Sequence, residues 1–248
     1  MPLSGNGPGV APLGFAPLAG PPGKAFGRPP LVRLEKVDLH YRGAAVLKDV
    51  SFSVAPGSFQ FLTGPSGAGK TSLLRLLSLS LRPSRGRLAL FGRDVSRLGS
   101  EEIAVLRRRI GMVFQDFRLL DHLTTYENVA LPLRVMGREE ASYRAVVIEL
   151  LRWVGLGDRM HILPPELSDG EKQRAAIARA IMVRPELLLA DGPTRNVDPT
   201  LAQRMLRLFV ELHRSGTAVI IATNDIALMD QYDARRLVLS DGQLYLDE

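Results

Sequence analysis

Hydrophobic and polar positions change their period several times along the chain, and each change predicts a structural element. Residues 32–41 and 45–54 alternate polar and apolar side chains, which predicts two paired strands near the start of the folded part. The apolar run 58–63 leads into a glycine-rich loop, and the leucine spacing of residues 71–81 predicts a buried helix. The order is therefore strand, loop, helix.

The middle third of the chain changes from strands to helices. Strands are expected at residues 86–91 and 110–114, separated by a short helix at 101–109. From residue 116 to about 165 the apolar positions follow a helical period. We therefore expect an inserted helical lobe over about 116–165.

The last third alternates helices and strands, which is typical of an α/β protein. No apolar run in the chain approaches the ~20 residues that cross a bilayer, so a membrane link has to go through a partner. The elements expected here are helices at 170–183 and 201–214, strands at 186–190 and 217–223, and a closing hairpin at 236–244.

The first 30 residues differ in composition from the rest. Fifteen of them are Gly or Pro, and the apolar core of a signal peptide is missing. Such a segment buries too little surface to offset its ordering entropy. A flexible tail is therefore expected at 1–30, followed by one folded domain at 31–248.

Charge and cysteine content narrow the classes of partner. The net charge is +6, but the arginines are interleaved with acids, which argues against a nucleic-acid partner. The dense basic cluster at 107–109 is expected to lie on one solvated helix turn. Cysteine is absent, which excludes disulfides, Cys zinc sites and thiol nucleophiles and favours a reducing compartment.

The glycine-rich loop carries the most specific chemistry. It has the phosphate-loop pattern and lies between an expected strand and an expected helix, as that pattern requires. Its glycines let backbone N–H groups converge on phosphate oxygens, while the lysine adds a charge and the threonine hydroxyl is placed for Mg²⁺. The alternative is a glycine-rich turn that binds nothing. The candidate phosphate-binding residues are Gly64, Pro65, Ser66, Gly67, Ala68, Gly69, Lys70, Thr71 and Ser72.

Two later segments complete the pattern of a nucleotide site. The apolar run 187–191 ends in Asp191, a carboxylate suited to a metal. The sequence LSDGEKQR opens a helix with Ser168 and Gly170, which predicts a second helix start that faces an anion. The alternative here is an ordinary N-cap at Ser168 with Glu171 completing a capping box.

Together these motifs resemble the ATP-binding subunits of ABC transporters, over nearly all of residues 31–248. The resemblance implies a P-loop NTPase fold of the ABC ATPase type, α/β, with a mixed central sheet, an antiparallel β subdomain and an inserted helical subdomain. It implies ATP and Mg²⁺ as cofactors, Tyr41 stacked on adenine, Gln115 linking metal and attacking water, and a loop at 196–198 crossing a dimer interface. Tyr41 as a half-buried strand aromatic and Gln115 as a strand cap are the alternatives. The implied metal ligands are Thr71, Gln115 and Asp191.

Within that family, residues 113–135 (VFQDFRLLDHLTTYENVALPLRV) are most similar to the FtsE group of cell-division ATP-binding subunits. This implies a homodimer that sandwiches ATP between the phosphate loop of one copy and the Ser168/Gly170 helix start of the other. It also implies a polytopic membrane partner resembling FtsX and a cytoplasmic position, peripheral on the inner face of the plasma membrane. ATPase subunits of lipoprotein-release and macrolide-type exporters remain the alternative.

Four positions depart from the family pattern. Gly192 replaces the glutamate that polarises the attacking water, and Asn224 replaces a histidine that contacts the γ-phosphate. Loss of a general base costs about 10²- to 10⁴-fold in rate. Asp169 replaces a signature glycine and brings negative charge toward the partner's ATP, while Arg195 replaces another glycine and could offset that charge. We therefore expect an ABC-type ATPase that binds Mg-ATP and hydrolyses it slowly or not at all, unless Asp198 or Asp225 replaces the missing base.

Overall fold

The framework of the chain is a pair of β-sheets, and the structure, a computed structural model, describes residues 29–41, 43–194 and 197–247. Its strands are β1 (Val32–Tyr41), β2 (Ala44–Val54), β3 (Phe59–Thr63), β4 (Arg85–Leu90), β5 (Arg93–Asp94), β6 (Ile110–Val113), β7 (Leu187–Asp191), β8 (Ala218–Ala222), β9 (Arg235–Ser240) and β10 (Gln243–Asp247). The antiparallel sheet has the order β2-β1-β4-β5, and the central sheet has the order β10-β9-β3-β8-β7-β6. The central sheet is mixed, because β9, β3, β8, β7 and β6 are parallel and β10 is antiparallel to β9.

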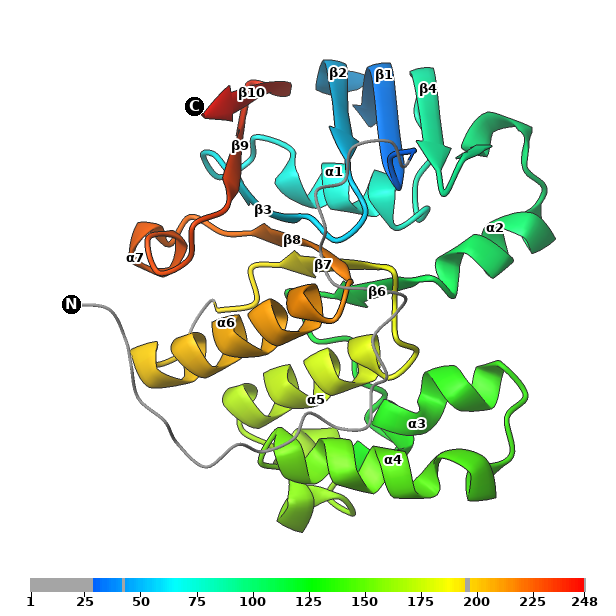
Figure 1. Cartoon of the computed structure of the whole chain (residues 1–248), viewed down its shortest axis with the longest axis vertical. Helices are drawn as coiled ribbons and strands as arrows, with labels where there is room; N and C mark the ends of the chain where they lie inside the picture. Colours follow the sequence, from blue (N-terminus) through cyan, green and yellow to red (C-terminus); the bar gives the residue numbers. More distant parts are fainter. Residues whose placement is uncertain (1–28, 42, 195–196, 248) are drawn as a thin grey trace.

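Helices cover both faces of the central sheet. In Figure 1, α1 lies between the two sheets, α5 and α6 cover the opposite face, and α3 and α4 lie beyond α5. This arrangement confirms the expected α/β fold with an antiparallel sheet and inserted helices. The helices are α1 (Lys70–Leu77), α2 (Ser100–Arg107), α3 (Thr125–Val135), α4 (Glu140–Trp153), α5 (Asp169–Ile181), α6 (Pro199–Arg214) and α7 (Ile226–Met229), with 3₁₀ turns η1 (Val95–Arg97), η2 (Gly157–Arg159) and η3 (Pro164–Glu166).

Alternate side chains of each central strand enter two different cores. In β7, Leu188 and Ala190 pack with α5 and α6, while Leu187 and Leu189 pack with α1 and the antiparallel sheet. This follows from the two-residue period of a strand, which explains why strands buried on both faces appear as continuous apolar runs. The central sheet is therefore fixed from both sides.

The parallel strands end at one common edge of the sheet. Asp191 at the end of β7 pairs with Ala222 at the end of β8, and Ala222 pairs with Leu62 of β3. Segments that follow these strands consequently lie close together, although they are far apart in the sequence. In open α/β sheets this carboxyl edge is where ligands bind.

Two helical regions are shorter than their sequence pattern predicts. The helix expected at 71–81 ends at Leu77, because Leu79 has a φ of +59° and the N–H of Ser80 turns back to the carbonyl of Arg75. Helical structure after β6 begins at Thr125 rather than at residue 116. The lobe boundaries of about 116–165 and the domain limits of 31–248 stay predictions.

The basic cluster at 107–109 was expected on one solvated helix turn, which holds for the exposed Arg107 and Arg108 at the end of α2 but is wrong for Arg109. Helix α2 ends at Arg107, whose guanidinium donates to the carbonyl of Leu79 at 2.7 Å. Arg109 lies beyond the helix and pairs with both carboxylate oxygens of Glu186, at 2.5 and 2.9 Å. Arg107 and Arg109 are therefore bonded to neighbouring elements.

The closing hairpin is confirmed and is longer than expected. Asp241 and Gly242 have φ values of +49° and +80°, which the favoured two-residue hairpin turn requires, and β10 continues to Asp247. Within the described ranges, no helix is long and apolar enough to span a bilayer.

Candidate nucleotide-binding site

The loop between β3 and α1 leaves the start of α1 open. Gly64 has a φ of +138°, and a Cβ added there would lie 1.9 Å from the carbonyl oxygen of Leu239, so the position excludes a side chain. The helix begins after Gly69, at a φ of +104°, and no side chain of the described residues caps its first turn. Its first backbone N–H groups and the positive end of its dipole are therefore available to an anion.

Lys70 bends back over the same loop. Its ammonium donates to the carbonyl oxygens of Gly64 and Pro65, at 2.5 and 2.9 Å. The charge is thus held at the start of the phosphate loop, which leads into the uncapped helix. Phosphate oxygens accept stronger, charge-assisted hydrogen bonds than neutral carbonyls do, so the lysine is suited to exchange these partners for phosphate.

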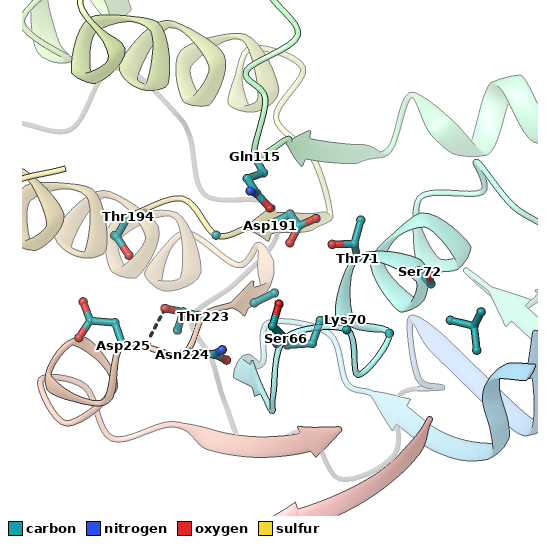
Figure 2. A pocket seen from close by; sticks show the side chains of 15 residues that line it. Ser66, Lys70, Thr71, Ser72, Gln115, Asp191, Thr194, Thr223, Asn224 and Asp225 are labelled. Atoms are coloured by element: carbon teal, nitrogen blue, oxygen red, sulfur yellow. Dashed lines mark hydrogen bonds between the residues drawn. The ribbon is translucent and has the colours of Figure 1, made fainter. Parts of the chain in front are cut away.

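A cleft of about 440 Å³ opens above this loop. Its walls come from the first turn of α1 and from the segments that follow β6, β7 and β8, as Figure 2 shows. The common carboxyl edge of these strands thus brings together residues that lie more than 100 positions apart in the sequence. The sequence-predicted residues that line it are Ser66, Gly67, Gly69, Lys70, Thr71, Ser72, Gln115, Asp191, Gly192 and Asn224.

Three oxygen-bearing side chains face the same part of the cleft. Asp191 is 7% exposed at the end of β7, and Figure 2 shows Gln115 and Thr71 directed toward it. Carboxylate, amide and hydroxyl oxygens suit Mg²⁺, which usually keeps several waters and takes further ligands from substrate phosphates. No group of three or more His, Cys, Asp or Glu side chains among the described residues could form a metal site without such help. The donor set therefore fits Mg²⁺ bound together with a nucleotide.

The position after Asp191 carries no side chain. Gly192 has a φ of +56°, lines the cleft and donates its N–H to the carbonyl of Ala222 at 2.8 Å. Asn224 is exposed and also lines the cleft, on the segment that follows β8. The structure therefore places these two of the four departures from the family pattern in the cleft that the phosphate loop lines. Their roles, like those of the other site residues, stay predictions.

Asp198 and Asp225, the carboxylates considered as substitutes for the missing base, both act as helix N-caps. Asp225 lines the cleft, but its Oδ1 accepts from the N–H of Leu228 at 3.0 Å and caps α7. Asp198 is not among the residues that line the cleft, and its Oδ1 accepts from the N–H of Leu201 at 2.9 Å. Each carboxylate is therefore held toward its own helix.

Of the expected ATP contacts, Gly64, Pro65 and Ala68 belong to the loop but do not line the cleft, and three others lie on different elements. Tyr41 is 59% exposed at the end of β1, so the half-buried alternative for this aromatic is wrong. Neither Tyr41 nor Ser168 nor Gly170 lines the cleft formed by the described residues. For Ser168 and Gly170 this is the arrangement that a site shared between two copies requires.

The start of α5 is a complete capping box. Ser168 Oγ accepts from the N–H of Glu171 at 3.3 Å, and the Glu171 carboxylate accepts from the N–H of Ser168 at 2.8 Å. The Ser168 N–H and the Ser168 hydroxyl both donate to the Glu171 carboxylate at 2.8 Å, and together with Arg159 they lower the pKa of Glu171. The N-cap interpretation of Ser168 is therefore confirmed, and it is compatible with a further contact from outside.

Two neighbours of Ser168 also have local roles. Asp169 has a side chain that is 70% exposed and pairs with Lys172 at 3.7 Å. A Cβ at Gly170 would come within 2.9 Å of Leu201 Cδ2, so this glycine also permits close packing of α5 on α6. Arg195 and Asn196 lie outside the described residues, and so does the proposed compensation between Arg195 and Asp169.

Sequence reasoning had not assigned Val46, Thr194 and Thr223 to the cleft that they line. Thr223 follows β8, and its Oγ1 accepts from the N–H of Asp225 at 3.1 Å, which sets the turn that carries Asn224. The signal for Thr223 was its place directly after an apolar run, at the same strand edge as Asp191.

Comparisons with known proteins agree with this geometry. The ABC transporter family profile matches residues 47–195. The cell division ATP-binding protein FtsE of Escherichia coli K12 is 45% identical over 216 residues, 87% of this chain and 97% of that protein. FtsE of Mycobacterium tuberculosis H37Rv is 41% identical over 88% of this chain and 96% of its own length.

A solved structure shows the same architecture. The ATP-binding cassette MJ0796, in a dimeric post-hydrolysis state with ADP and Pi bound, superposes with a TM-score of 0.82 at 31% identity, covering 88% of this chain and 98% of that one. Family profile, relatives and architecture agree, and the chain therefore belongs to the ABC transporter family of ATP-binding proteins.

Proposed function

We propose that the chain is the ATP-binding subunit of an FtsE-like complex in cell division, which binds Mg-ATP, dimerises around it and controls a polytopic membrane protein resembling FtsX. Hydrolysis is weak or lost. One observation supports this most directly. A single cleft brings together the uncapped start of α1, Lys70 and the side-chain oxygens of Thr71, Gln115 and Asp191. The same cleft has Gly192 where the family carries its catalytic glutamate. The protein would then act on the cytoplasmic face of the membrane.

In this proposal, Mg-ATP is bound by groups that the fold already places around the cleft. Backbone N–H groups of the loop and the first turn of α1 receive the phosphates, and Lys70 supplies the positive charge. Thr71, Gln115 and Asp191 would hold Mg²⁺, which neutralises phosphate charge when it is bound. Tyr41, exposed at the end of β1, is the proposed partner of the adenine ring.

Dimerisation would complete the site. Ser168 and Gly170 lie away from the cleft on the first turn of α5, so their contact with ATP requires a second copy. The dimeric state of the solved relative MJ0796 supports this assembly. Nucleotide occupancy then controls whether two copies are held together.

Slow hydrolysis follows from the residues present. Water next to a terminal phosphate needs a base, and Gly192 offers none, while Asp225 is occupied by its N-cap bond at 3.0 Å. Asn224 can donate a hydrogen bond but cannot carry a proton as an imidazolium does. The complex therefore signals by occupancy more than by turnover.

The proposed membrane partner would dock in a groove of about 520 Å³ between α2, β6, α3 and α5. The groove is lined by apolar side chains, among them Val135, which is 70% exposed, and Leu120, which is 38% exposed. The charged side chains that line the groove are those of Arg107, Arg108, Arg118 and Arg179. An amphipathic cytoplasmic segment with acidic residues has the matching chemistry.

Two measurements test this function. Equilibrium dialysis of the purified chain with Mg-ATP should give about one nucleotide per chain, and no binding would contradict the proposal. Val135→Glu should abolish co-purification with the membrane partner, since it places a charge in an apolar groove. Val105→Glu is the matched control, because Val105 is 52% exposed and is not part of the groove. Equal retention of the partner by both variants would exclude this docking surface.

A further inference from the structure

The chain makes an unusual turn directly after Gln115. Phe117 and Arg118 both have left-handed backbones, with φ values of +56° and +51°. L-residues with side chains rarely adopt this conformation, because Cβ approaches the following carbonyl, and two in succession require support from the surroundings. The turn is therefore held in place by contacts rather than by its own preference.

The support comes from Arg179 of α5. Its guanidinium donates to the carbonyl oxygens of both strained residues, at 2.7 Å for Phe117 and 2.5 Å for Arg118. The planar guanidinium fork is suited to hold two acceptors at once, which an ammonium is not. Arg179 is half-buried, and this burial lowers the pKa of its guanidinium.

The side chain of Arg118 contributes from the solvent side. It lies over the ring of Phe114 at 4.1 Å and pairs with Asp116 at 3.1 Å, but it is 46% exposed. Exposed ion pairs contribute little, whereas the two charge-assisted hydrogen bonds of Arg179 bind the backbone of both strained residues directly. Arg179 is therefore the main internal anchor of the segment that carries Gln115.

We propose that Arg179 is a positioning residue for Gln115, which fixes the strained turn at 117–118 and so aims the Gln115 amide at the metal side of the cleft. The inference rests on the proposed binding of Mg-ATP there. Arg179 belongs to α5, the helix whose N-cap is Ser168. One rigid helix thus carries the proposed contact with the partner's ATP at its start and the anchor of Gln115 near its end.

The test measures how much Mg²⁺ strengthens ATP binding. The affinity of the full chain for a fluorescent ATP analogue is determined with Mg²⁺ and with EDTA. Loss of a residue that orients a metal ligand typically weakens metal binding about 10-fold or more, so Arg179→Met should lower the Mg²⁺ enhancement about 10-fold. Affinity in EDTA should stay unchanged, which a general loss of folding would not allow.

Combining the substitutions shows whether Arg179 acts through Gln115. Gln115→Ala should reduce the Mg²⁺ enhancement to the same extent, and the double variant should show no further loss, because the two side chains would act in one pathway. Arg82→Met is the control, since it removes another arginine–carbonyl bond, to Leu98 at 2.9 Å, away from the cleft. Additive losses, or an unchanged Mg²⁺ effect in Arg179→Met, would overturn the inference.

A milder pair of variants covers the case in which Arg179→Met does not fold. Arg179→Lys keeps the charge but loses the fork, so it should lower the Mg²⁺ enhancement in a folded protein. Adding Arg118→Gly should restore it, because glycine adopts the left-handed turn without support. Absence of this rescue counts against the inference. If the wild-type chain binds no ATP at all, the proposed function itself fails, which is a different result.

Discussion

Gly192 is the residue at which nucleotide binding and nucleotide turnover separate. It follows the buried Asp191, lines the cleft, and has a φ of +56° that favours glycine. A side chain in this backbone conformation costs about 1–2 kcal/mol. The position thus combines a missing catalytic group with a backbone suited to its absence.

Restoring the carboxylate at this position should restore part of the rate. Gly192→Glu is expected to raise steady-state ATP hydrolysis at least ~10-fold, because a positioned general base contributes about 10²- to 10⁴-fold and Asn224 still differs from the family pattern. Gly192→Gln is the control: it carries the same backbone cost without a base, so its melting temperature should fall equally while its rate stays low. Equal rates for the two variants would show that the defect lies elsewhere.

Lys70 gives the corresponding test of binding. Lys70→Ala removes the ammonium at the start of the phosphate loop, and hydrogen bonds to charged groups contribute about 1.5–3 kcal/mol, so the dissociation constant for Mg-ATP should rise about 10- to 100-fold. Isothermal titration calorimetry provides the measurement. Lys48→Ala, on the exposed side of β2, should bind as the wild type does. An unchanged affinity in Lys70→Ala would show that the phosphate loop does not bind the nucleotide.

At the scale of elements, the starts of α1 and α5 differ in their capping, and this determines which of them is open to phosphate. Helix α1 begins without a side-chain cap among the described residues, whereas α5 begins with the Ser168–Glu171 capping box and carries two carboxylates in its first turn. One positive helix end is therefore open to phosphate, and the other is already partly neutralised by its own sequence.

The capping box predicts a pH dependence of stability. The folded-state pKa of Glu171 lies below its ordinary value of 4.5, because Ser168 and Arg159 favour the carboxylate. Its contribution is therefore complete above pH 4.5 and disappears as the pH falls through the lowered folded-state pKa. In urea unfolding, the wild type should be more stable than Glu171→Gln at pH 7, and the two should converge below that window. A constant difference down to pH 3 would contradict this origin of the stabilisation.

Strands with a continuous apolar run could be predicted from the sequence, whereas helix ends and short capped helices could not. Buried strands such as β7 and β8 were predictable, because four or five successive apolar residues between polar or turn-forming residues leave few alternatives. The end of α1 was not, since Leu79 and Leu81 continue the leucine spacing although Leu79 turns left-handed. The short α7 was also missed, because it depends on Asp225 as N-cap rather than on a periodic pattern.

The candidate site was predictable where its residues follow one another in the sequence. The phosphate loop could be assigned from its glycines, and Asp191 from the apolar run before it. Thr223 and the strained turn at 117–118 were not assigned, because their roles depend on the common strand edge and on Arg179, which is 61 residues from Arg118. Contacts of this kind require the folded chain.

At the scale of the whole molecule, the proposed dimer places Asp169 near the nucleotide of the partner. The carboxylate is 70% exposed and pairs with Lys172 at 3.7 Å, which weakens its repulsion of phosphate. Asp169→Asn should tighten ATP-dependent dimerisation by up to about 5-fold, since exposed charge interactions contribute up to about 1 kcal/mol. Sedimentation velocity with Mg-ATP provides the measurement, and Glu149→Gln on α4 is the control. Weaker dimerisation in Asp169→Asn would show that the carboxylate helps to hold the interface.

Steady-state ATP hydrolysis by the purified wild-type chain, at a Mg-ATP concentration that saturates binding, separates an occupancy-controlled subunit from a rapidly cycling one. Enzymes turn over with a median of about 10 s⁻¹, and loss of the base costs about 10²- to 10⁴-fold, so we expect a rate of about 0.1 s⁻¹ or less with the site fully occupied. A rate of about 1 s⁻¹ or more at the same occupancy would contradict the proposal that Gly192 leaves the protein able to bind ATP but nearly unable to hydrolyse it.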